Sequence, residues 1–167
     1  NGTTKINYQG RDIDLTPPFQ RVSMNEAVKQ VTGVDFYACA TDEEAREKAK
    51  SLKLEVKDKT ASSGKLLAEA FDAFVEDTLI QPTFIIDYPV EISPLSKRKP
   101  SAPHLTERFE LFIAGHEYAN AFSELNDPVD QRGRFTQQAQ ERLKGDDEAM
   151  MIDEDFCLAL EYGLPPT

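Results

Sequence analysis

Residues 105–128 have the sequence LTERFELFIAGHEYANAFSELNDP, and the rest of the chain is best interpreted outward from them. Two runs rich in apolar and aromatic side chains, 107–114 and 117–125, flank Gly115-His116. A glycine between two such runs is typical of a β-hairpin turn. Asp127 then supplies a side chain that caps a helix, with Pro128 at the favoured first position. We therefore predict two antiparallel strands followed directly by a helix.

The predicted hairpin carries an unusual number of carboxylates. Glu107, Glu110, Glu117 and Glu124 stand among aromatic residues, although acidic residues are depleted in strands. One interpretation is a solvated outer face. The other is an acidic pocket, because hard divalent cations take carboxylate oxygens and an ammonium group pairs with glutamate beside an aromatic ring. The residue pattern alone leaves both interpretations open.

Strands and helices are also expected on either side of the hairpin. The β-rich run 83–87 lies between two prolines and predicts a buried strand, and 5–14 predicts a strand or hairpin arm. The proline-rich and basic run 93–105 predicts an exposed loop. After Asp127 we expect a helix whose buried side comprises Val129, Phe135, Ala139 and Leu143. A last short helix follows, with Phe156, Cys157 and Leu160 inward.

Three helices are expected between the first strand and residue 82. Ser23 and Thr41 each open a capping box, and Ser62 or Ser63 caps a longer helix. That helix has an apolar stripe at helical spacing, formed by Leu67, Ala70, Phe71, Phe74 and Val75. The predicted class is α+β, with 1–22 and 82–167 forming the core of an antiparallel sheet flanked by helices and 23–81 a helical insertion in the same domain.

Composition restricts the classes of function. The chain has a net charge of −11, with 40% hydrophobic and 29% charged residues, which is typical of a globular domain. The negative charge argues against tight non-specific nucleic-acid binding, although local contacts with RNA stay open. No apolar run approaches the roughly 20 residues of a membrane span. Cys39 and Cys157 lie far apart without metal-ligand spacing, and we expect two reduced thiols.

Four stretches of this sequence together resemble one family. They are residues 12–19 (DIDLTPPF), 82–95 (PTFIIDYPVEISPL), 105–128 and 145–167, the last including GDDEAM and ALEYGLPPT. All four resemble the catalytic domain of class II lysyl-tRNA synthetases, between the second and third signature motifs. The ending Ser93-Pro94-Leu95 favours the lysine enzymes over their aspartate and asparagine relatives. The resemblance covers nearly the whole chain, more loosely at 34–65.

The resemblance implies a role for each of five residues. Glu110 and Glu117 resemble the pair that holds Mg2+ against the phosphates of the substrate ATP. Asn120 resembles the residue that helps to orient lysine, and Phe122 the aromatic side chain that lines the lysine pocket. Glu124 resembles the carboxylate that receives the lysine ε-ammonium group. No residue of this segment is expected to act as a general base.

The five residues can form one site only if Glu110 lies on the same face of the sheet as the residues of the second strand. Asn120, Phe122 and Glu124 share one face of a strand because side chains alternate. A two-residue turn at Gly115-His116 would place Glu110 opposite Ala121, on the other face. We therefore predict either an odd-length loop, such as 115–117, or a bulge.

The resemblance also implies what lies beyond this segment. The second motif and the glycine-rich third motif are absent, so we expect a segment of a longer synthetase that is inactive by itself. The parent enzyme would use lysine, ATP and tRNA(Lys), form a homodimer and work in the cytoplasm or an organelle, without a membrane. The alternatives are a non-catalytic synthetase-like module that binds lysine or a protein partner, and an acidic structural domain.

Overall fold

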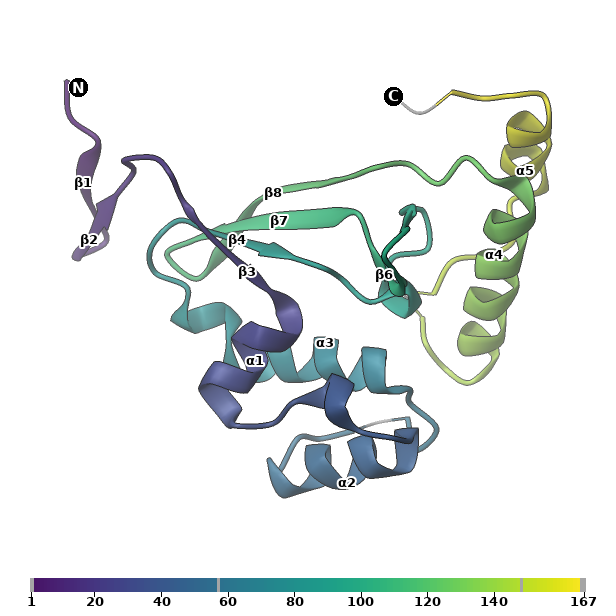
Figure 1. Cartoon of the computed structure of the whole chain (residues 1–167), viewed down its shortest axis with the longest axis horizontal. Helices are drawn as coiled ribbons and strands as arrows, with labels where there is room; N and C mark the ends of the chain where they lie inside the picture. Colours follow the sequence, from purple (N-terminus) through teal and green to yellow (C-terminus); the bar gives the residue numbers. More distant parts are fainter. Residues whose placement is uncertain (1, 57, 148, 166–167) are drawn as a thin grey trace.

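A four-stranded sheet forms the centre of the computed structural model, which describes residues 2–56, 58–147 and 149–165. Its strand order is β3 (Gln20–Ser23), β4 (Thr83–Ile86), β7 (Arg108–Ile113) and β8 (His116–Phe122). The sheet is antiparallel except between β3 and β4, which run parallel because a helical crossover connects them. The predicted α+β class is confirmed (Figure 1).

The crossover contains α1 (Met24–Thr32), α2 (Asp42–Ser51) and α3 (Ser63–Phe74), with single 3-10 turns at Phe36–Ala38 and Glu76–Thr78. The predicted caps are confirmed: Ser23, Thr41 and Ser62 each accept a hydrogen bond from the backbone N–H three residues ahead. These helices lie together on one side of the sheet (Figure 1). The division into a core and an insertion stays a prediction.

The main hydrophobic core lies between this helical layer and the sheet. Phe71 of α3 meets Phe112 of β7 edge to face, with ring centroids 5.5 Å apart, and Leu66, Leu67 and Ile85 are fully buried beside them. The predicted stripe of α3 therefore faces inward, although Phe74 is only half-buried. Burial of each such side chain stabilises the fold by about 1.5–3 kcal/mol. This packing fixes β7 and hence the residues that β7 carries.

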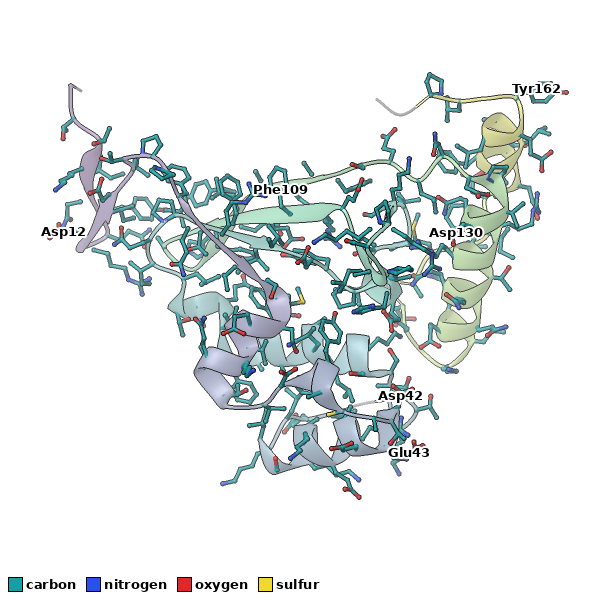
Figure 2. The ribbon with its side chains drawn as sticks, viewed as in Figure 1. Asp12, Asp42, Glu43, Phe109, Asp130 and Tyr162 are labelled. Atoms are coloured by element: carbon teal, nitrogen blue, oxygen red, sulfur yellow. The ribbon has the colours of Figure 1, made fainter. Side chains whose placement is uncertain are left out.

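The other face of the sheet is also aromatic. Phe84 of β4 contacts Phe19 and Phe109, with centroid separations of 6.1 and 5.3 Å. Figure 2 shows Phe109 on the side of the sheet away from α1–α3. Side chains of β7 therefore alternate between the helical layer and this second face.

Two small hairpins accompany the sheet. The first consists of β1 (Lys5–Tyr8) and β2 (Arg11–Asp14), so the run 5–14 forms both arms of a hairpin. The second consists of β5 (Arg98–Lys99) and β6 (Ala102–Thr106). The prediction of an exposed loop at 93–105 is wrong. After a 3-10 turn at Val90–Ile92, this segment packs against the sheet and α4, and Ser93, Ser96 and Leu105 are buried.

The C-terminal helices are α4 (Pro128–Leu143), capped by Asp127, and α5 (Glu154–Glu161), capped by Asp153. The predicted buried side of α4 is confirmed at Phe135, and Ala139 is half-buried, but the prediction is wrong at Val129 and Leu143, which are 80% and 90% exposed. Gln131 and Arg134 are buried instead, since this face of α4 meets the backbone carbonyls of Pro94, Ser93 and Ser96. In α5, Cys157 and Leu160 are buried as predicted.

Cys39 and Cys157 are free thiols. Among the described residues, no helix has the length and apolarity that a bilayer crossing demands. Pro166 and Thr167, which end the last stretch of the resemblance, lie outside the described residues.

Candidate functional site

The hairpin between β7 and β8 turns at Ala114-Gly115, one residue earlier than predicted. Both residues have positive φ angles, 57° and 79°, as a two-residue type I′ turn requires. Ile113 therefore pairs with His116. The predicted turn at Gly115-His116 and the odd-length loop at 115–117 are both wrong.

A β-bulge provides the geometry that the odd-length loop was expected to provide. Phe112 pairs with Glu117, but the next partner of Leu111 is Ala119, so Tyr118 is an extra residue on β8. This confirms the alternative prediction of a bulge. Beyond it, Glu110 pairs with Asn120 and Arg108 with Phe122. In a regular ladder from the same turn, Asn120 would instead face Phe109, on the wrong side of the sheet.

Glu110 is the centre of a hydrogen-bond network. Its carboxylate is buried, and Oε2 accepts a bond of 2.7 Å from the hydroxyl of Tyr88. Oε1 accepts bonds from the Arg108 guanidinium (2.5 Å) and from the Asn120 amide (3.1 Å). Burial and the Glu110 charge raise the pKa of Tyr88, which keeps the phenol protonated as a donor. The carboxylate is thus held in one orientation.

Glu117 lies near Glu110 at the other end of the bulge. Burial, and next the negative charge of Glu110, raise the pKa of the Glu117 carboxyl above its ordinary value, while Arg108 and a hydrogen bond from Asn120 act against these effects. A cation near the Glu117 carboxylate would stabilise its ionised form against these effects. Asn120 therefore contacts both predicted metal-binding residues.

Phe122 and Glu124 follow along the same strand. Phe122 is 37% exposed and lies across from Arg108. Glu124 lies beyond the end of β8, where it bridges to Ser96 and where the N–H of Leu125 donates to the carbonyl of Leu95. The segment that was predicted to be an exposed loop therefore positions the backbone at Glu124. By alternation, Asn120 and Phe122 face the same side of β8, and Glu124 follows two positions beyond Phe122.

Arg108 and Tyr88 were not among the predicted site residues. Arg108 was discoverable, because it stands two positions before Glu110 on one strand and must share its face. Tyr88 carried no such signal, since a tyrosine between an aspartate and a proline has no local reason to meet Glu110. Their guanidinium and ring stack, with Cζ of Arg108 4.5 Å from the ring centroid of Tyr88.

A hollow of about 1020 Å³ lies elsewhere, between α3, the segment that precedes it and the end of α4. Lys65 there makes ion pairs with Glu141 (2.5 Å) and Asp146 (3.3 Å). None of the five predicted site residues lines this hollow. We therefore take the face of the hairpin that carries Glu110, Asn120 and Phe122 as the candidate site, because the possible ligands are gathered there. On β7 this is the face that Phe112 shares.

The candidate site suits a magnesium ion that is shared with a substrate. Mg2+ is typically held by one or two carboxylates together with substrate phosphates and waters. Glu110 and Glu117 supply two carboxylates, and the described residues contain no group of three or more metal-ligating side chains that would form a complete protein cage. The donor set therefore fits Mg2+ bound with a phosphorylated substrate.

The fold and this acidic hairpin define a class of enzyme. The family model for tRNA synthetases class II (D, K and N) matches residues 2–167, and the chain belongs to this family. Within the family, its relatives are lysine–tRNA ligases. Those of Thermoanaerobacter pseudethanolicus, Bacillus subtilis and Staphylococcus aureus are 59%, 56% and 54% identical over 99–100% of this chain. The chain spans 33% of the length of these relatives.

Proposed function

We propose that this chain forms the lysine-binding and magnesium-binding part of a longer enzyme that activates lysine with ATP and transfers it to tRNA(Lys). The names of the relatives support the amino acid and the tRNA. We further propose that the enzyme is a homodimer and works in the cytoplasm.

One observation carries the proposal, namely the bulge at Tyr118. It places Glu110, Glu117, Asn120 and Phe122 on a single face of the hairpin. A solvated outer face needs no such register. A site that must use a carboxylate pair and an amide together does need it.

Glu124 accounts for selectivity toward lysine in this proposal. Its carboxylate receives the ε-ammonium group, while Phe122 packs along the methylene stem of the substrate. A neutral amino acid brings no positive charge to this half-buried carboxylate, so it forgoes the ion pair with the ammonium group, which costs roughly 3–5 kcal/mol when the pair is buried by the bound substrate. Asn120, held by Arg108 through a bond of 3.2 Å, orients the amino-acid end.

The chemical step is the attack of a lysine carboxylate oxygen on the α-phosphorus of ATP. The new O–P bond forms as the bond to the bridging oxygen breaks, and pyrophosphate leaves with that electron pair. Bound Mg2+ would neutralise phosphate charge during this step. Glu110 and Glu117 would hold it, and the step needs positioning and electrostatic stabilisation rather than a general base.

The test is ATP–pyrophosphate exchange by the full-length protein, with each of the twenty amino acids in turn. We expect exchange with lysine only, and we expect Glu124→Gln to lose it while the protein stays folded by circular dichroism. Exchange that is driven by aspartate or asparagine, or full activity of the Glu124→Gln variant, would contradict the proposed function.

A further inference from the structure

The side chain of Arg108 connects two parts of the candidate site. One terminal nitrogen donates to Glu110 Oε1 at 2.5 Å, and its Nε donates to Asn120 Oδ1 at 3.2 Å. Glu110 belongs to the proposed metal end and Asn120 to the proposed amino-acid end. A single planar group thus contacts both.

Arg108 is itself held firmly. Its other terminal nitrogen donates to the carbonyl of Ile92 (3.0 Å) and to the hydroxyl of Ser93 (3.1 Å), and its plane lies over the ring of Tyr88. The side chain is only 16% exposed. Because the guanidinium fork is rigid and fully engaged, it has one available orientation.

The network also distinguishes the two oxygens of Glu110. Oε1 accepts two hydrogen bonds, from Arg108 and Asn120, which use both of its lone pairs. Oε2 accepts one, from Tyr88. Oε2 therefore keeps a lone pair that can bind a cation, while the contact with Arg108 fixes the orientation of the carboxylate.

We propose that Arg108 is a positioning residue that sets Glu110 and Asn120 together and so couples magnesium binding to lysine binding. The proposal rests on the proposed function and adds a residue to it. Arg108→Lys keeps the positive charge but loses the planar guanidinium with its several donors, so it distinguishes the effect of orientation from the effect of charge. Loss of a group that orients a metal ligand typically lowers metal affinity by about 10–100-fold.

The experiment compares Arg108→Lys with Arg21→Lys in the full-length protein. Arg21 is a matched control on the opposite face of the same sheet, where its guanidinium lies 5.7 Å from the Phe84 ring centroid. Three quantities are measured: the KM for lysine in pyrophosphate exchange, the Mg2+ concentration for half-maximal exchange, and the Kd for lysine by calorimetry without ATP or Mg2+. The last needs no turnover and no metal.

For Arg108→Lys we expect all three quantities to rise by about tenfold or more, whereas Arg21→Lys leaves them unchanged. A variant that loses only kcat, through a smaller folded fraction, would overturn the proposal. So would a rise in the magnesium requirement without a rise in the lysine constants, because the coupling would be absent. If the wild-type protein shows no lysine-dependent exchange, the proposed function fails and this inference with it. An active wild type with an unaffected Arg108→Lys variant overturns this inference alone.

Discussion

Two single-residue deletions in β8 test the register of the site. Deletion of Tyr118 removes the bulge residue, so the ladder runs regularly from Phe112–Glu117 to Glu110–Asn120 and every site residue keeps its face. Deletion of Ala121 instead moves the residues after it by one position. Phe122 and Glu124 then shift by about 3.4 Å and turn to the opposite face.

The expected effects differ by orders of magnitude. Tyr118 is 55% exposed, so its deletion removes little buried contact, and we expect kcat/KM for lysine to fall by about tenfold or less. Deletion of Ala121 separates the Glu124 carboxylate from the substrate ammonium group, a loss of roughly 3–5 kcal/mol. At 1.36 kcal/mol per factor of ten, this corresponds to a fall of about 160- to 5,000-fold.

The assay is lysine-dependent pyrophosphate exchange by the full-length protein, with circular dichroism and thermal unfolding to confirm that both deletion variants fold. A Tyr118 deletion that is as inactive as the Ala121 deletion would refute the argument that the bulge residue serves only to set the register. An Ala121 deletion with near-normal activity would refute the placement of Phe122 and Glu124.

Three further predictions concern the support of the site. Arg134→Met removes the buried donor to the carbonyls of Ser93 and Ser96 and one of the two arginines that bond the Asp130 carboxylate, and it should weaken the attachment of α4 by about 1–3 kcal/mol, measured as faster amide hydrogen exchange in α4. Burial acts to raise the pKa of Asp130, but hydrogen bonds from two arginines outweigh it and hold this pKa below the ordinary value of 3.8. The stability that Asp130 contributes is therefore present above pH 3.8 and disappears as the pH falls through its folded pKa, so acid titration should show wild type and Asp130→Asn converging there. Gly115→Ala and Gly10→Ala each place a side chain at a similar positive φ angle, +79° and +80°, and each should lower the free energy of unfolding by about 1–2 kcal/mol. Only the new Cβ at position 115 contacts another backbone, at Asp77 in the 3-10 turn after α3, 3.4 Å away. Only Gly115→Ala should therefore also reduce pyrophosphate exchange.

Local signals in the sequence predicted local structure well. The caps at Ser23, Thr41, Ser62 and Asp127 depend on a side chain and a backbone N–H a few residues away, so they are visible in the sequence. The strand at 83–86 was equally visible, because its apolar run is bounded by prolines.

The turn at Ala114-Gly115 was missed because distant residues select it. The N–H of Ala114 donates to the carbonyl of Ile80, the N–H of Gly115 donates to that of Leu79, and Arg11 donates to the carbonyl of Ala114. These contacts hold an alanine at positive φ, which its own preference disfavours. No pattern within residues 105–128 contains that information.

The inward face of α4 was mispredicted for a related reason. Apolar spacing predicted Val129 and Leu143, but the helix packs against a segment with open backbone carbonyls, which need donors rather than methyl groups. Gln131 and Arg134 supply those donors. The same segment positions the backbone at Glu124. Tertiary contacts, which apolar spacing does not reveal, therefore determine this part of the site.

A crystal structure of the full-length protein with lysine, Mg2+ and an unreactive ATP analogue would test the site most directly. We expect carboxylate oxygens of Glu110 and Glu117 about 2.0–2.1 Å from the metal. We also expect the Glu124 carboxylate about 2.7–2.9 Å from the ε-nitrogen of lysine, on the face that Asn120 and Phe122 share. A metal held by other residues, or lysine bound away from this face of the hairpin, would contradict the assignment.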